Sequence, residues 1–205
     1  DCTTFQHAIE TVCVPLATRL YDRHRRRLGL AALRPWDLSD GSWGRPAPTT
    51  HEQPLRPYQS TNDLLAKSLH LLQQLDPQLS AEFRLMIDEQ LLDLENRKGK
   101  APGGYCTYLA TAQRPFIFMN AVGLHRDVET ILHEAGHAFH AFAKSRLPYR
   151  HQMQAPMEFN EVASMAMELF AAPYLSANGS GFYQPADAAR ARVQHLEEMV
   201  FFWPY

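Results

Sequence analysis

The sequence has little cysteine and no long apolar run. Its three cysteines are Cys2, Cys13 and Cys106, an odd number without the spacing of a zinc finger. This argues against a disulfide-stapled scaffold and favours reduced thiols, as in the cytoplasm. A signal peptide and an apolar stretch of about 20 residues are both missing, so we expect a cytoplasmic protein that does not enter a membrane.

The sequence also lacks a strong charge of either sign. Its 20 basic and 22 acidic residues leave a formal net charge of −2, so we expect it to bind neither nucleic acid nor an anionic membrane. The one dense basic run, residues 22–27, is either an anion contact or a solvated helix end, and the helix dipole favours the second interpretation. With 45% hydrophobic residues, the chain has the composition of an ordinary globular protein.

The most informative stretch is residues 133–137, His-Glu-Ala-Gly-His. Apolar spacing predicts a helix over residues 127–146, with Asp127 as its N-cap. Residues four apart share one helix face, so His133 and His137 can reach the same metal ion. Glu134 stands beside them, where it can act on metal-bound water. The alternative is an ordinary amphipathic helix that happens to carry histidines.

A third metal ligand is expected, because catalytic zinc takes three protein ligands and leaves a fourth position for water. A second predicted helix, residues 156–175, carries Glu158, Glu161 and Glu168 on one face. Three carboxylates among apolar neighbours repel each other unless a cation lies there, although a solvated acidic face has the same pattern. The spacing alone does not choose among the three.

The rest of the chain predicts a mainly α fold with a small β element. Further helices are expected over residues 4–28, kinked at Pro15, and over residues 63–75, 81–97 and 186–202. Asn62 and Ser80 are candidate N-caps of the second and third of these helices. Residues 33–58, rich in proline and glycine, are predicted to be irregular, with Trp36 and Trp43 as candidate anchors.

Two short β-type runs, residues 105–110 and 115–120, are predicted to form a hairpin beside the metal-binding helix. An exposed strand edge offers unpaired backbone groups that can hold an extended peptide. Gly103 and Gly104 allow close backbone approach, and Tyr105 follows them, so these three residues are predicted to bind substrate. A purely structural hairpin is the alternative. Cys106 has no evident base partner in the sequence, which favours a buried thiol over a nucleophile.

These motifs resemble the oligoendopeptidase F and thimet oligopeptidase family of zinc peptidases. The resemblance is carried by HEAGHAFH with DVETIL before it, by EFNEVASMAMELF downstream, and by GKAPGGYCTYLATAQRPFIFMN before the zinc helix. It implies a helical, zincin-like catalytic domain with a small hairpin or sheet next to the zinc helix. It further implies one Zn²⁺ per chain, held by His133, His137 and Glu161, with Glu134 as general base.

The resemblance also implies supporting residues around the ligands. Glu168 matches an acid that orients a ligating histidine through its other ring nitrogen. His140 and Asp127 are predicted to lie around the ligands as well, His140 in a supporting or a packing role.

The expected activity is that of a zinc endopeptidase acting on short oligopeptides. The family carries a later segment with histidine and tyrosine groups that stabilise the transition state, and this sequence does not include it. The alternative is therefore a non-catalytic, zinc-bearing fragment that binds peptides and needs the remaining segments of its full-length enzyme as partners. As part of a catalytic domain, residues 1–97 are expected to be helical, 98–122 to form the loop and β edge, 123–175 the zinc-site helices, and 176–205 a closing helix.

Overall fold

The computed structural model describes residues 2–38, 53–176 and 181–202, so Trp43 and most of the segment predicted to be irregular lie outside the described residues. Contacts divide the chain into two compact units, Asp1–Gln53 with Ala189–Tyr205, and Pro54–Ala188. In the described part, no helix is long and apolar enough to cross a membrane.

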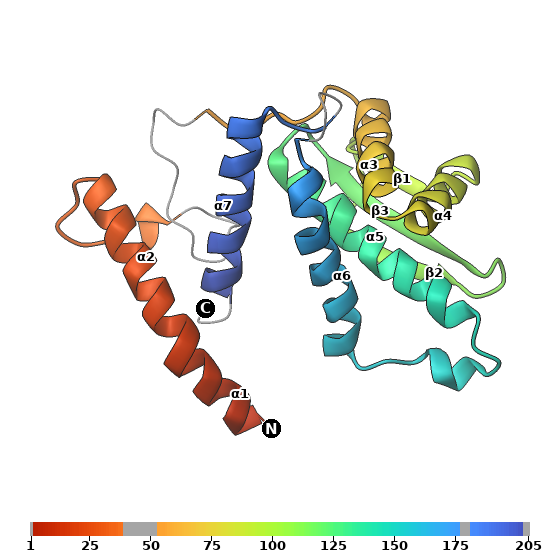
Figure 1. Cartoon of the computed structure of the whole chain (residues 1–205), viewed down its shortest axis with the longest axis horizontal. Coiled ribbons are helices and arrows are strands. Elements are labelled where there is room, and N and C mark those ends of the chain that lie inside the picture. The colour runs from red at the N-terminus through yellow and green to blue at the C-terminus, as the bar shows by residue number, and fades with distance from the viewer. Residues whose placement is uncertain (1, 39–52, 177–180, 203–205) are drawn as a thin grey trace. The chain divides into compact units, whose positions relative to one another are not determined.

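The larger unit is mainly helical around a small sheet, as predicted (Figure 1). Its helices and strands, in chain order, are α3 (Thr61–Leu75), α4 (Pro77–Asp88), β1 (Leu92–Glu95), β2 (Tyr105–Leu109), β3 (Arg114–Ala121), α5 (His125–Ser145), the 3₁₀ turn Arg150–Met153, α6 (Met157–Ala171) and the 3₁₀ turn Ala172–Tyr174. The three strands lie in the order β1-β3-β2, with β1 parallel and β2 antiparallel to β3. The predicted hairpin is confirmed, and β2 lies at an edge of the sheet.

The core of this unit is formed by apolar side chains from α3, α4, α5 and the sheet. Its largest fully buried members are Leu64, Leu71, Leu72, Phe83, Met86, Leu94, Ile117, Met119, Val128 and Ile131. Helix α5 contacts β2 and β3 as well as α6, so the helix with the histidines lies between the edge of the sheet and the helix with the glutamates.

The prediction of one helix over residues 81–97 was wrong. Helix α4 ends at Asp88, Gln90 takes a left-handed conformation with φ of 56°, and Leu92–Glu95 forms strand β1. The apolar residues at 91 and 94 fit helical spacing. Pairing of Leu92 with Ile117 instead places Leu94 in strand β1, and the Leu91 carbonyl just before the strand accepts the Ile117 amide. A long-range strand partner overrides local propensity here.

The predicted N-caps of α3 and α4 were also wrong. Ser60 caps α3 by accepting the Asp63 amide at 3.2 Å. Asp76 caps α4 by accepting the amides of Gln78 at 2.7 Å and Leu79 at 3.1 Å, and Pro77 occupies the first turn, where no amide donor is needed.

The smaller unit contains α1 (Cys2–Ala8), a π-helical turn (Ile9–Cys13), α2 (Val14–Arg27), the 3₁₀ turn Pro35–Asp37 and most of α7 (Pro185–Phe202). The π turn ends two residues before Pro15, whose missing N–H removes one helical hydrogen bond and favours a local widening. Helix α2 ends at Arg27 and is followed by Gly29 at φ of 66°, where the Leu30 amide donates to the Arg25 carbonyl. Trp36, a candidate anchor, is 78% exposed.

Candidate metal centre

Two helices bring three candidate ligands together. His133 and His137 lie one turn apart on α5, and Glu161 lies on α6. Nε2 of His133 is 3.2 Å from Oε2 of Glu161, and Nε2 of His137 is 3.5 Å from Oε1 of the same carboxylate. One donor atom from each residue lies within 4.8 Å of the others. Two imidazole nitrogens and a carboxylate oxygen form a donor set that suits Zn²⁺.

The two helices approach closely because Gly136 has no side chain. A Cβ at this position would lie 2.6 Å from Cα of Ser164 and 2.7 Å from the Ala163 carbonyl oxygen. Such backbone contacts leave no room for a methyl group. Gly136, between the two histidines, therefore lets α6 bring Glu161 to them. This role of Gly136 was not predicted from the sequence, although a glycine within a helix is unfavourable unless packing requires it.

Ser164 fixes the third ligand and was likewise not predicted. Its side chain is fully buried, and its hydroxyl lies 3.0 Å from both Oε2 and the main-chain carbonyl of Glu161. A donor at this place restricts the rotation of the Glu161 carboxylate, so the oxygens face the histidines.

Glu168 lies behind His133 and hydrogen-bonds to its ring. Its Oε1 is 2.6 Å from Nδ1 of His133, so Nδ1 donates and Nε2 is turned toward Glu161. This carboxylate–histidine pair fixes both the tautomer and the orientation of the ring. Burial has the largest single effect and lowers the pKa of His133. The hydrogen bond to Glu168, together with the negative charges of Glu168, Glu134 and Glu161, outweighs it, so the net pKa of His133 is raised. Burial lowers the pKa of His137, which favours the neutral imidazole that binds metals.

Replacing Glu168 tests this support. We expect Glu168→Gln to weaken zinc binding about tenfold and Glu168→Ala toward a hundredfold, because the amide keeps an acceptor but loses the charge. Competition with a zinc-sensitive fluorescent chelator measures both affinities. Equal affinity in the parent and both variants would contradict the role of Glu168.

Glu134 points toward the edge of the sheet. It is buried, and the backbone of Cys106 in β2 hydrogen-bonds to its carboxylate. Burial has the largest effect and raises the pKa of Glu134. The charge of His133 lowers this pKa and the charge of Glu161 raises it, and the net shift is upward. A carboxylate with a raised pKa holds a proton more readily, as a general base that later acts as an acid requires.

The free edge of β2 faces α5. Ile117 pairs with Cys106, but its amide donates to Leu91 on the β1 side, so Cys106 and Ile117 form a pair without hydrogen bonds between them. The backbone groups of Cys106 therefore point away from the sheet, toward Glu134. By strand alternation those of Tyr108 point the same way.

The predicted substrate-binding residues lie at the start of this edge. Gly103, Gly104 and Tyr105 are exposed, and the Tyr105 ring stacks on Phe118 with centroids 5.0 Å apart. Gly103 has φ of 101°, and a Cβ on Gly104 would lie 3.1 Å from the Thr130 methyl of α5. The structure places these residues beside the metal helix, and their role in binding stays a prediction.

Asp127 lies apart from the ligand cluster. Helix α5 begins at His125 with Leu124 as N-cap, so Asp127 occupies the third position and is not the N-cap that was predicted. Its carboxylate accepts the amides of Val122 at 2.9 Å and Leu124 at 2.8 Å and binds the Tyr58 hydroxyl. These contacts anchor the start of α5.

Three other residues considered near the motif, His140, Cys106 and Glu158, lie outside the cluster of candidate ligands. The His140 ring packs near Phe159, with centroids 6.3 Å apart. Burial, followed by the charge of Glu134, raises the pKa of Cys106 to about 12, which leaves its thiol protonated and unsuited to nucleophilic attack. Glu158 is exposed and is not part of the three-residue cluster.

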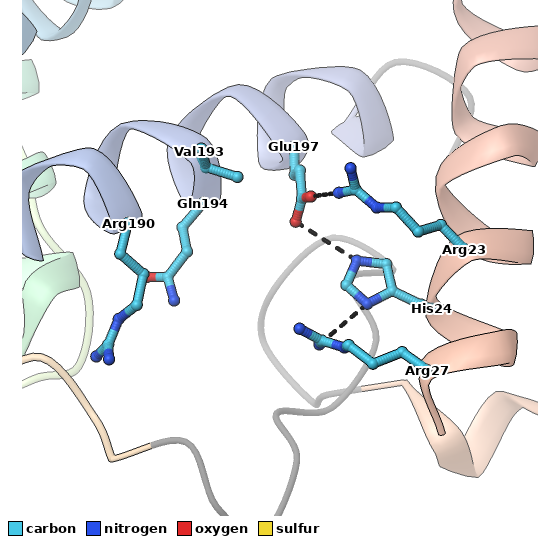
Figure 2. Close-up of a pocket in the computed structure, with 7 residues that line it drawn as sticks. All are labelled: Arg23, His24, Arg27, Arg190, Val193, Gln194 and Glu197. Carbon is cyan, nitrogen blue, oxygen red and sulfur yellow. Dashed lines mark hydrogen bonds and ion pairs between the residues drawn. The ribbon is translucent and has the colours of Figure 1, made fainter. Parts of the chain in front are cut away.

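The basic run of α2 is paired within its own unit (Figure 2). Arg23 forms an ion pair with Glu197 of α7, and Nε2 of buried His24 lies 3.4 Å from the same carboxylate. Asp22 binds both Arg25 and Arg26. Much of the positive charge that suggested an anion contact is thus neutralised by neighbouring carboxylates.

Two of the comparisons with known proteins agree on one family. The profile of peptidase family M3 matches residues 1–201. A solved structure assigned as oligoendopeptidase F is 30% identical with a TM-score of 0.83, covering 99% of this chain and 34% of its own. PZ peptidase A, solved with an inhibitor, is 32% identical with a TM-score of 0.83 and the same coverages.

A third solved structure, assigned as oligoendopeptidase F from Bacillus anthracis str. Ames, is 29% identical with a TM-score of 0.80, covering 97% of this chain and 34% of its own. The chain thus spans 34% of the length of each of these three solved structures. None of the curated proteins matches it.

Proposed function

Because the chain belongs to peptidase family M3, we propose that it forms the metal-binding core of a zinc-dependent endopeptidase that hydrolyses short oligopeptides. The observation that carries the proposal is the convergence of His133, His137 and Glu161, with Glu134 buried beside them. Three candidate ligands and a neighbouring carboxylate are the protein groups that metal-assisted hydrolysis requires.

His133, His137 and Glu161 would hold one zinc ion. When bound, zinc polarises a carbonyl and lowers the pKa of its water toward 7. Glu168 keeps His133 in the tautomer that presents Nε2, and Ser164 keeps the Glu161 oxygens turned inward. These two contacts prepare the ligand positions before the metal arrives.

Glu134 moves the proton in this mechanism. Its carboxylate accepts a proton from the attacking water and passes it to the leaving amine of the cleaved peptide bond. The raised pKa supports both steps, since a carboxyl with an ordinary acidic pKa holds the proton less well between them. The Cys106 backbone orients the carboxylate from the β2 side.

The substrate would bind along the free edge of β2 as an added strand. Backbone pairing holds an extended chain without reading its side chains, which suits peptides of varied sequence. Gly103, Gly104 and Tyr105 would form the entry to this edge. The choice of oligopeptides is supported by the solved relatives assigned as oligoendopeptidases. Free thiols at all three cysteines support a cytoplasmic location.

A peptide-cleavage assay tests the proposal. The zinc-loaded chain is mixed with a pool of quenched fluorescent peptides of roughly 5 to 10 residues, lengths that an edge strand can pair with. Cleavage is followed before and after removal of zinc by a chelator. We expect cleavage that stops on chelation and returns with added zinc. Cleavage that survives chelation would contradict zinc dependence. Binding of peptides by the zinc-loaded chain without any cleavage would favour the non-catalytic, peptide-binding alternative.

A further inference from the structure

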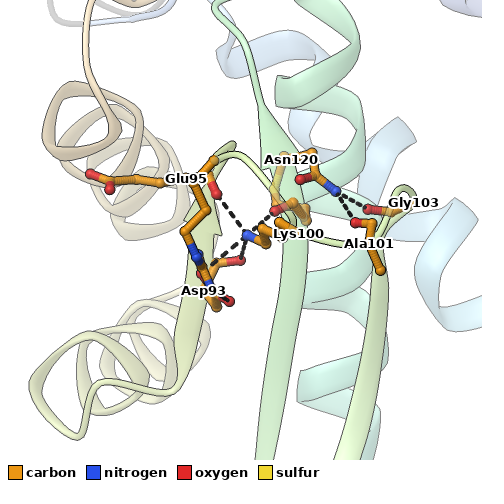
Figure 3. A network of polar contacts seen from close by, with 8 residues as sticks. Asp93, Glu95, Lys100, Ala101, Gly103 and Asn120 are labelled. Atoms are coloured by element: carbon orange, nitrogen blue, oxygen red, sulfur yellow. Dashed lines mark hydrogen bonds and ion pairs between the residues drawn. The ribbon is translucent and has the colours of Figure 1, made fainter.

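Lys100 is a buried cation in the loop between β1 and β2 that the metal centre does not use. Its side chain is 1% exposed, and Nζ lies 3.1 Å from Oδ1 of Asp93. The ammonium also donates to the carbonyls of Asp93 at 3.0 Å, Glu95 at 2.8 Å and Met119 at 2.5 Å (Figure 3). It lies 4.4 Å from the centre of the Phe118 ring. Because a buried charge is costly unless it is fully paired, these contacts hold the loop in one place.

Asn120 ties the same loop from the other side. Its Nδ2 donates to the carbonyls of Ala101 at 2.9 Å and Gly103 at 3.0 Å, which uses both amide hydrogens (Figure 3). Asn120 directly follows Met119, whose carbonyl accepts from Lys100. One end of β3 therefore holds the loop at two successive residues.

The topology of the sheet explains why the loop needs these ties. Strand β1 ends opposite Ala121 and β2 begins opposite Phe118, at the same end of β3. Since β3 lies between them, residues 96–104 must cross over that end of β3. The hydrogen bonds of Lys100 and Asn120 hold this crossing segment in place just before Gly104 and the edge strand β2.

We propose that Lys100 and Asn120 are positioning residues that set the place of the peptide-binding edge, residues 103–106, relative to Glu134. The inference rests on the proposed function, because it takes that edge as the place where substrate binds. Neither residue belongs to the metal cluster. Both residues act through the backbone. The carbonyl of Gly103 accepts a hydrogen bond from Asn120, and three residues later the backbone of Cys106 contacts Glu134.

Asn120→Leu is the decisive variant, because leucine keeps the size of asparagine and removes both donors. We expect the backbone amides within residues 101–106, apart from Pro102, which has no amide hydrogen, to exchange hydrogen roughly tenfold faster, since two hydrogen bonds are lost. We also expect KM for peptides to rise roughly tenfold with kcat within about threefold, as for a loss of ground-state binding. Lys100→Met leaves several buried carbonyls unpaired and is expected to unfold the unit, so it is not the primary test.

Arg97→Ala is the matched control. Arg97 is exposed and binds the same Asp93 carboxylate at 2.6 and 2.8 Å, but among the residues that the structure describes its side chain has no hydrogen bond to a loop carbonyl. We expect neither exchange nor KM to change in this variant.

Two results for Asn120→Leu would overturn the proposal. One is unchanged exchange at residues 101–106, and the other is equally faster exchange throughout the sheet and α5, which would indicate a merely structural role. If the zinc-loaded parent binds peptides without cleaving them, the proposed activity fails. Hydrogen exchange at the loop and the Kd for peptides, measured in place of KM, then still test the positioning role. No peptide binding by the parent would overturn it too.

Discussion

Glu134→Gln is expected to keep zinc and to lose peptide cleavage by a factor of about a hundred to ten thousand, the usual contribution of a general base. Glutamine has nearly the size of glutamate and can still accept the hydrogen bond from the Cys106 backbone. It cannot take a proton from water or pass one to the leaving amine. Zinc content measured by elemental analysis, together with initial rates of peptide cleavage, separates loss of metal from loss of the base.

Glu158→Gln is the matched control for this experiment. Glu158 lies on the neighbouring helix α6, is exposed and stands outside the metal cluster, so both zinc and cleavage should match the parent. A Glu134→Gln protein that cleaves peptides at more than a tenth of the parent rate would rule out Glu134 as the base.

Gly136→Ala is expected to have the second large effect. A methyl group here meets the backbone of Ser164 at 2.6 Å and of Ala163 at 2.7 Å, and backbone atoms on a helix cannot rotate away as side chains do. Overpacking of this kind costs about 1 to 3 kcal/mol, and we expect a value at the upper end. The better helix propensity of alanine offsets about 1 kcal/mol.

The Gly136→Ala substitution should also weaken the metal site, because moving α6 outward carries Glu161 away from His133 and His137. We expect a lower midpoint of thermal unfolding and weaker zinc binding, followed by calorimetry and chelator competition. Ala143→Ser, which adds one atom on the exposed face of the same helix, should change neither. A Gly136→Ala protein with the stability and zinc affinity of the parent would show that close helix approach does not build the site.

The ligand-bearing helices could be predicted from the sequence because their pattern is local. His133, Glu134 and His137 lie within one and a half turns of a helix, and the carboxylates downstream share a face at helical spacing. Glu161 was singled out by resemblance to a peptidase family, and the match to the family profile confirms that the chain belongs to it. In the structure Glu161 faces the histidines, whereas Glu168 supports His133 from behind.

What the sequence did not predict depends on contacts between distant residues. Strand β1 was taken for the end of a helix because its partner, β3, lies more than 20 residues further along the chain. Gly136 and Ser164 matter only when α5 packs on α6, and Lys100 only when the loop crosses β3. Such roles become visible with tertiary packing, which overrides local propensity.

The most direct test of the metal centre is the zinc content per chain after dialysis, measured in the parent and in Glu161→Ala. The donor atoms of His133, His137 and Glu161 converge within 4.8 Å, so we predict about one zinc per parent chain, as three protein ligands hold one ion. In Glu161→Ala, the loss of a charged ligand should release most of this zinc. A folded parent without zinc, or a variant that keeps it fully, would contradict the three-ligand centre from which the proposed chemistry follows.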